Sequence, residues 1–195
     1  ARSAPRADAP VTAFLYLLPC AGEDLIKLGI SRDPLARARS LAPRWFEFFD
    51  LDRAWLLQAD AIAEAQSWET ALKRSLKPHN APAPLLSVRA AGGFSEWFRG
   101  AHRAVLDYMD AMAGQGFALH PARPWLGQAL ARGSDSLYGW ADALWQSMLE
   151  SGIDPSLHPL APSLRDACDE QAAFALEVGT RMPAAVARWY RDVRG

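Results

Sequence analysis

Cysteine is scarce in this sequence of 195 residues, which contains only Cys20 and Cys168. Two cysteines so far apart have neither the paired spacing of a zinc site nor the density of a disulfide framework. They are typical of reduced thiols, so we expect a cytoplasmic protein. The four histidines are also scattered along the chain and lack the spacing of metal ligands.

Long hydrophobic runs are absent as well. The longest uninterrupted one, residues 13–18, is far shorter than the ~20 residues that a membrane-spanning helix needs. Residues 1–10 are rich in Ala, Pro, Arg and Asp and have no apolar core of a secretory signal. We therefore expect a flexible N-terminal tail and no membrane association.

The chain also lacks a basic surplus, since its net charge is −1. Nucleic-acid binders often carry a strong positive charge. Residues 1–100 hold 13 Lys and Arg against 11 Asp and Glu, so the first half is only slightly basic. A local basic patch is nevertheless present, formed by Arg37, Arg39, Lys73, Arg74 and Lys77. Affinity for DNA should be modest unless a partner protein contributes.

Several well-known motifs are missing: there is no P-loop, no G-x-G-x-x-G, no G-x-S-x-G elbow and no H-E-x-x-H. What is present is a pattern of short elements. Residues 12–18 alternate as a strand does, and residues 25–30 form its hairpin partner after a Gly-Glu-Asp turn. A helix follows to about residue 41, a third strand spans residues 54–57, and residues 60–76 form an amphipathic helix that Pro78 stops.

The second half of the chain shows no convincing strand alternation. Helices are predicted at about residues 136–149, 163–178 and 183–193. The expected fold is α+β: a small three-stranded antiparallel sheet flanked by helices in residues 11–118, followed by an all-helical extension in residues 119–195. The first extension helix carries an apolar stripe that should be largely buried, or else bind a protein partner or a second copy; it comprises Leu137, Trp140, Leu144, Trp145 and Met148.

Short motifs in the first half occur in a defined order. They are Phe14-Leu15-Tyr16, Lys27-Leu28-Gly29, Arg37, a helix carrying Glu69, then Pro78 with Asn80, and finally Glu96-Trp97-Phe98. This series resembles the GIY-YIG endonuclease superfamily. It is most similar to the branch whose second signature reads K-[ILV]-G-I-S and whose domain closes with E-W-F. The resemblance covers about half of the chain, residues 11–101.

The resemblance implies a GIY-YIG-like fold and cleavage of DNA phosphodiester bonds with one Mg²⁺ or Mn²⁺ ion. Tyr16 would activate water, Arg37 would hold the phosphate, and Glu69 would bind the metal. Lys27 and Asn80 would be supporting members of the catalytic set. Lys27 stands where the family has its second signature tyrosine, and Asn80 comes one residue earlier than usual. The basic residues beside the cleft, Arg39, Lys73, Arg74 and Lys77, would contact DNA.

Each of these residues also has an ordinary structural explanation. Glu69 can be a solvated glutamate paired with Lys73 four residues later on the same helix. Tyr16 can be a buried strand aromatic, and Lys27 an exposed strand lysine. The competing interpretation of the whole chain is a catalytically inactive GIY-YIG-like module that binds nucleic acid or protein.

Overall fold

The computed structural model describes residues 12–85 and 95–194; the expected N-terminal tail, residues 1–10, lies outside them. Contacts divide the chain into two units, residues 1–123 and 124–195, called here the N-terminal unit and the C-terminal unit. The fold class is α+β, as predicted.

The N-terminal unit is built around an antiparallel sheet with the strand order β4-β2-β1-β3-β5. Its strands are β1 (Ala13–Pro19), β2 (Leu25–Ser31), β3 (Trp55–Ala59), β4 (Trp97–Arg99) and β5 (Leu119–Pro121). The predicted three-stranded sheet is therefore wrong in strand number. The two added edge strands have three residues each, too short for the alternation that reveals a strand in a sequence. They exist because their backbones pair with β2 and β3.

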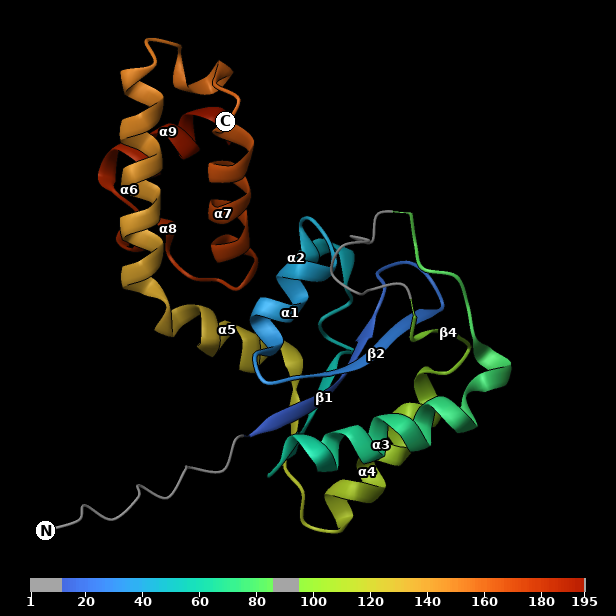
Figure 1. Cartoon of the computed structure of the whole chain (residues 1–195). Helices are drawn as coiled ribbons and strands as arrows, with labels where there is room; N and C mark the ends of the chain where they lie inside the picture. The colour runs from blue at the N-terminus through green and yellow to red at the C-terminus, as the bar shows by residue number, and fades with distance from the viewer. Residues whose placement is uncertain (1–11, 86–94, 195) are drawn as a thin grey trace, which may run out of the picture. The chain divides into compact units, whose positions relative to one another are not determined.

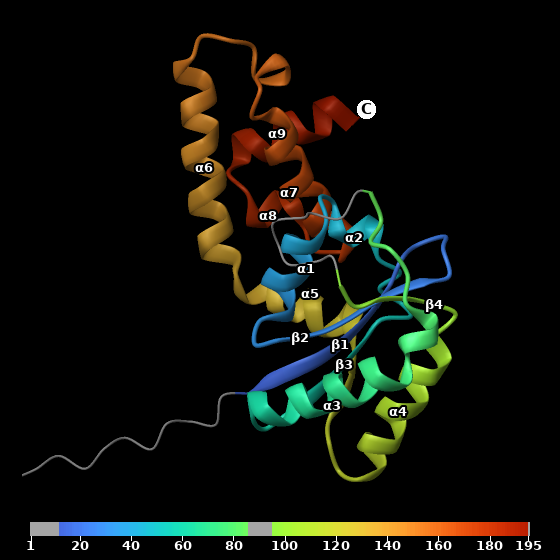
Figure 2. The same ribbon diagram turned by 45° about the vertical axis from the view of Figure 1, so that its right-hand side comes forward.

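Helices cover both faces of this sheet (Figures 1 and 2). The helices α3 (Ile62–Ser75) and α4 (His102–Gly114) lie against one face, and α1 (Pro34–Leu41) and α2 (Trp45–Phe48) lie on the other. A short 3-10 turn, η1 (Lys77–His79), ends the α3 segment. The α3 face of the sheet is a continuous apolar core, to which alternate residues of β1 contribute, namely Ala13, Leu15 and Leu17.

Alternation along β1 directs Phe14, Tyr16 and Leu18 to the opposite face of the sheet. All seven residues of β1 are buried, so the strand is covered on both sides. The two faces differ in chemistry, however. Directly opposed residues of an antiparallel pair share a face, and Tyr16 is paired with Gly29 and Leu18 with Lys27. The second face therefore carries polar groups within the sheet.

The C-terminal unit is helical in the part that the structure describes. Its elements are α5 (Ala122–Arg132, which contains the boundary between the units), α6 (Ser134–Glu150), η3 (Pro155–Leu157), α7 (Ala161–Ala173), α8 (Val178–Arg181) and α9 (Ala184–Arg194). Helix α5 was not predicted, and β5 shows that residues 119–121, expected in the helical extension, form a strand.

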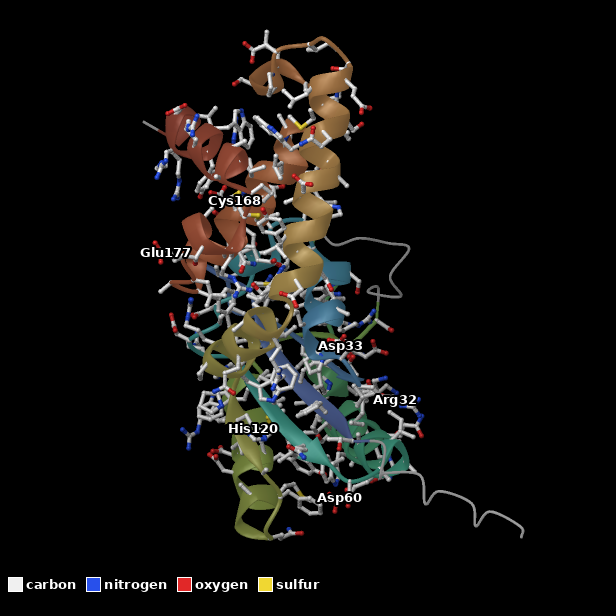
Figure 3. All side chains as sticks on the ribbon, turned by 90° about the vertical axis from the view of Figure 1, so that its left-hand side faces the viewer. Arg32, Asp33, Asp60, His120, Cys168 and Glu177 are labelled. Atoms are coloured by element: carbon white, nitrogen blue, oxygen red, sulfur yellow. The ribbon has the colours of Figure 1, made fainter. Side chains whose placement is uncertain are left out.

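A separate apolar core holds the helices of the C-terminal unit together. Trp145 of α6 and Trp189 of α9 lie with ring centroids 5.9 Å apart, and Cys168 of α7 is buried beside them; Figure 3 labels Cys168 among these helices. Most of the predicted stripe is buried or packs against this core. Trp140 is the exception, with 44 % of its surface exposed, because its neighbour Ala141 takes the inward position on α6.

No helix in residues 12–85 and 95–194 combines the length and the apolarity needed to cross a membrane.

Candidate active site at the edge of strand β2

Tyr16 and Gly29 face each other across the β1–β2 pair. The Tyr16 ring lies directly over Gly29, and a Cβ atom on residue 29 would overlap the tyrosine hydroxyl. Glycine is therefore required here for space, which is the close approach that a glycine inside a strand often indicates. The missing side chain allows the phenol group to lie flat across the neighbouring strand.

Arg37 reaches the same hydroxyl from helix α1. The start of this helix is fixed by Asp33, labelled in Figure 3, whose carboxylate accepts a hydrogen bond of 2.9 Å from the Ala36 N–H, and by Pro34 in the first turn. One turn along, the Nε of Arg37 donates to the Tyr16 hydroxyl oxygen at 3.2 Å. Sequence positions 16 and 37 are thus brought into direct contact.

Lys27 is fully buried, with no exposed surface. The alternative of an exposed strand lysine is therefore wrong. Its ammonium donates to the Ser95 carbonyl oxygen at 2.5 Å and to the Glu96 carboxylate at 2.9 Å, and it lies 5.6 Å from the centre of the Trp97 ring. A buried charge needs such partners, because removing it from water is costly.

Glu96 holds an unusual backbone conformation, with φ +68°, in the left-handed region that side chains other than glycine rarely adopt. It immediately precedes β4, which pairs with β2 only over Leu25–Lys27. At that point the Glu96 carbonyl accepts the Leu28 N–H at 3.1 Å. In this conformation the Glu96 carboxylate contacts Lys27 on β2. Residues with a strained backbone are often functional.

The Glu96 carboxylate receives three donors. Lys73 and the Ser95 hydroxyl both bond to Oε1 at 2.7 Å, and Lys27 bonds to Oε2. Burial alone would raise the pKa of this carboxyl, but these hydrogen bonds outweigh it and lower the pKa to about 2. Glu96 is therefore a permanent anion at the centre of the cluster.

Glu69 joins the cluster through Lys73. Both lie on α3, four residues apart, and the Lys73 ammonium is 3.2 Å from Glu69 Oε2 as well as 2.7 Å from Glu96 Oε1. The helix position follows from Ala65, Trp68 and Leu72, which bury the opposite stripe of α3. The i,i+4 pair considered in the sequence analysis is therefore formed, and it is part of a larger network.

Electrostatic interactions connect the Tyr16–Arg37 contact to this network. Burial raises the pKa of the Tyr16 hydroxyl; Arg37 opposes this rise, and the charges of Glu96 and Glu69 add to it. Burial also lowers the pKa of the Lys27 ammonium, against the effect of Glu96. Burial thus favours the neutral hydroxyl form of Tyr16 over the phenolate.

Asn80 lies beside the same cluster. It forms an isolated β-bridge with Phe98 and lines an open hollow of about 370 Å³ together with Lys73, Ser95 and Glu96. The described residues that complete its lining are Ala81, Trp97 and Phe98. Asn80 is thus placed at the hollow, apart from the Tyr16–Arg37 contact.

The expected DNA-contacting residues separate into two groups. Arg39, Arg74 and Lys77 are exposed to solvent, where phosphate could reach them. Lys73 is instead drawn into ion pairs with Glu69 and Glu96.

Sequence reasoning assigned no role to Glu96 and Ser95, although Glu96 receives more hydrogen bonds than any predicted site residue. The E-W-F motif was the available signal. A glutamate directly before two apolar residues, Trp97 and Phe98, is brought to the edge of a core by its neighbours. Nothing in the sequence pattern indicated that it would meet Lys27, 69 residues earlier.

Glu69 is the carboxylate predicted to hold a single hard cation at this site. Glu69 retains 16 % side-chain exposure, so solvent reaches it, and the Lys73 ammonium already occupies the space between two carboxylates as a positive charge would. Among residues 12–85 and 95–194, no group of three or more His, Cys, Asp and Glu side chains could hold a metal. A Mg²⁺ ion here would rely on one carboxylate and water, which suits its preference for a largely hydrated shell.

No family model, curated protein or solved structure matches this chain. Membership of the GIY-YIG superfamily therefore stays a prediction from the motifs.

Proposed function

We propose that this protein is a metal-dependent DNA endonuclease of the GIY-YIG type. The observation that supports this most is the contact between Tyr16 and Arg37 beside an ion-pair network that includes Glu69. Arg37 donates to the Tyr16 hydroxyl, and from the same face of the sheet Lys27 bonds to Glu96, which holds Lys73 beside Glu69. Tyr16, Arg37 and Glu69 come from one strand and two helices separated by 53 positions, and they supply the hydroxyl, cation and carboxylate that phosphodiester hydrolysis needs.

Each residue is given a role that suits its environment. Arg37 would hold the scissile phosphate, because a guanidinium pairs well with phosphate oxygens. Tyr16, whose pKa burial raises, would orient Arg37 and the attacking water and would not remove a proton. Lys27 has no exposed surface, so we assign it a positioning role behind the site.

Glu69 would hold a Mg²⁺ or Mn²⁺ ion. Such an ion supplies charge stabilisation at the phosphorane and assists the leaving oxygen. The exposed residues Arg39, Arg74 and Lys77 would bind flanking phosphates, and Asn80 at the hollow would support the bound strand.

The decisive experiment is a nicking assay on supercoiled, linear and branched DNA with Mg²⁺ or Mn²⁺. Glu69→Gln keeps the shape of the side chain and removes its charge, so cleavage should fall by orders of magnitude. Arg37→Ala should also reduce the rate strongly, since Arg contacts to a reacting phosphate contribute several kcal/mol (roughly 3). Glu150→Gln and Arg188→Ala, exposed positions in the C-terminal unit, are matched controls and should cleave normally.

Arg39→Ala tests DNA binding separately from cleavage. It should weaken binding and reduce the slope of log K against log salt by about one if it neutralises one phosphate. Wild-type protein that cleaves no DNA form with either metal would contradict the endonuclease proposal.

A second candidate is a binding module that keeps the fold without catalysis. The observation in its favour is that Lys73 already pairs with Glu69, while Tyr16 and Lys27 are buried. Salt-dependent DNA binding without cleavage, unaffected by Glu69→Gln, would support this candidate over the first.

A further inference from the structure

Two carboxylates share one ammonium in the candidate site. The Lys73 Nζ lies 2.7 Å from Glu96 Oε1 and 3.2 Å from Glu69 Oε2. A cation this close to Glu69 opposes a second cation there, because like charges a few ångströms apart repel. Whatever controls the position of Lys73 therefore controls the affinity of Glu69 for metal.

Glu96 is built as a fixed anchor. Its backbone carbonyl accepts the Leu28 N–H, which ties it to β2, and its Oε2 is held by the buried Lys27. Lys73, in contrast, has 35 % of its side chain exposed and belongs to a residue type with a long flexible stem. Of the two partners in the Lys73–Glu96 pair, the lysine is the one able to move.

Both oxygens of Glu96 are engaged, Oε1 by Lys73 and Ser95 and Oε2 by Lys27. This leaves Glu96 poorly suited to coordinate a metal itself. Among the described residues, the ion pair that would remain for Lys73 without Glu96 is the i,i+4 pair with Glu69, a geometry that helices favour.

We propose that Glu96 is a positioning residue that acts through Lys73: by holding the Lys73 ammonium, it keeps the Glu69 carboxylate able to accept a divalent cation. The inference rests on the proposed function, in which Glu69 binds the metal. It adds that Glu96 and Glu69 share the positive charge of Lys73, which the sequence did not reveal. Lys73 competes with the divalent cation for the Glu69 carboxylate, and Glu96 weakens this competition by holding the Lys73 ammonium.

The test is a double-mutant cycle on Mn²⁺ binding by the full chain without DNA, measured from the free Mn²⁺ signal in electron paramagnetic resonance. Glu69→Gln should abolish the site. Glu96→Gln should weaken binding at least threefold, because Lys73 then pairs with Glu69 alone. Lys73→Met should tighten binding at least threefold, and adding Glu96→Gln to it should change the affinity by less than twofold.

Matched controls are Arg188→Met and Glu150→Gln, which remove exposed charges in the C-terminal unit and should leave Mn²⁺ binding unchanged. Because Glu96→Gln also deprives the buried Lys27 of its anion, the variant can fail to fold. The cycle is then repeated in a Lys27→Met background, in which that requirement is removed.

Three results would overturn the proposal. Glu96→Gln could weaken Mn²⁺ binding by the same factor with and without Lys73, which would show that Glu96 does not act through Lys73. Lys73→Met could leave the affinity unchanged or lower it. The third result would be that neither the wild type nor Lys73→Met binds Mn²⁺ detectably. The nicking assay is read separately: an intact cycle without cleavage refutes the endonuclease, and cleavage without the cycle refutes only the role of Glu96.

Discussion

The two units of this protein bury different polar side chains. In the N-terminal unit, the fully buried Lys27 is paired with Glu96 next to the sheet. In the C-terminal unit, the buried polar side chains among the described residues are Glu170 and Gln171, and Gln171 accepts a hydrogen bond of 2.8 Å from Arg181. The same guanidinium donates to the Leu130 carbonyl at 2.8 Å, near the end of α5.

The contacts of Arg181 and of Lys27 show how the buried polar groups of the two units differ. Arg181 donates to a carbonyl in the last turn of α5, that of Leu130, which also accepts the Gly133 N–H at 3.1 Å. That contact completes the fold. Lys27 also donates to a backbone carbonyl, that of Ser95, but its ion pair with Glu96 is not a general requirement of a core, since apolar residues of similar volume often stabilise a core as well or better. A buried charge pair beside a strained backbone is consistent with the proposed function.

Two tyrosines show the same contrast at the level of one hydroxyl. The Tyr16 hydroxyl accepts a hydrogen bond from Arg37, whereas the Tyr190 hydroxyl donates to Asp169 at 2.5 Å. Burial raises the pKa of both, and the adjacent Asp169 raises that of Tyr190 further. The Tyr190 hydroxyl is a hydrogen-bond donor to a carboxylate. The Tyr16 hydroxyl is an acceptor in its bond with Arg37, and its O–H can donate to another group.

The largest effect is expected from removing these two hydroxyls in turn. Tyr16→Phe leaves the Arg37 Nε without its acceptor, so nicking should fall by about 100-fold, the usual cost of losing one oriented polar group in an active site. Tyr190→Phe should leave the nicking rate within twofold. Equal rates for wild type and Tyr16→Phe would place the functional hydroxyl elsewhere.

The next effect concerns the apolar core of the C-terminal unit. Trp145→Ala removes a ring that contacts Trp189 and should lower the free energy of unfolding by about 3–5 kcal/mol. Trp140→Ala, five residues earlier on α6 and 44 % exposed, should cost under about 1 kcal/mol. Urea titration followed by circular dichroism measures both, and amide exchange in β1 should stay unchanged. Equal losses for the two tryptophans would contradict the packing described here.

A smaller effect should appear on acidification of the N-terminal unit. The folded pKa of Glu96, about 2, lies below its ordinary value of 4.5, so the native state favours the ionised form. The resulting stability is present above about pH 5 and is lost as the pH falls toward 2. After allowance for partial exposure of the carboxylate, we expect this to be of the order of 2 kcal/mol.

Amide exchange of β2 between pH 6 and pH 3 measures this loss. Glu96→Gln should flatten the pH dependence, because no proton can then bind at that position, and Glu150→Gln should not. A wild-type profile with the same slope as that of Glu96→Gln would show that the ion pair does not contribute.

Effects of opposite sign are expected at two glycines with opposite surroundings. Gly29→Ala would force a methyl group into the Tyr16 ring and should destabilise the protein by about 1–3 kcal/mol. Gly139 lies within α6, where an added Cβ meets nothing within 4 Å. Gly139→Ala should therefore stabilise the C-terminal unit by about 0.5–1 kcal/mol. Thermal melts of both variants give the signs directly, and a stabilising Gly29→Ala would refute the close contact.

The elements with strong local signals were predictable. The β1–β2 hairpin, α1 and α3 occur where alternation, the Asp33-Pro34 start and the apolar stripe of α3 placed them. The edge strands β4 and β5 could not be predicted, because three residues carry no period and their pairing depends on partners 72 and 64 positions away.

The site divides in the same way. Motif order selected Tyr16, Arg37 and Glu69 as candidates, which stay a prediction, and the i,i+4 spacing was enough to foresee the Glu69–Lys73 pair. The burial of Lys27 and the central place of Glu96 were not foreseeable from spacing.

The sequence by itself determined the residue types available for chemistry and the local helices and strands, since these depend on neighbours within a few positions. Only the tertiary structure decided which charges meet. Glu96 reaches Lys27 and Lys73 because β4 pairs with β2 and because Glu96, the residue before β4, adopts a left-handed backbone conformation. Long-range strand pairing determines which charged side chains of this site meet and how deeply they are buried. No local sequence pattern encodes that pairing.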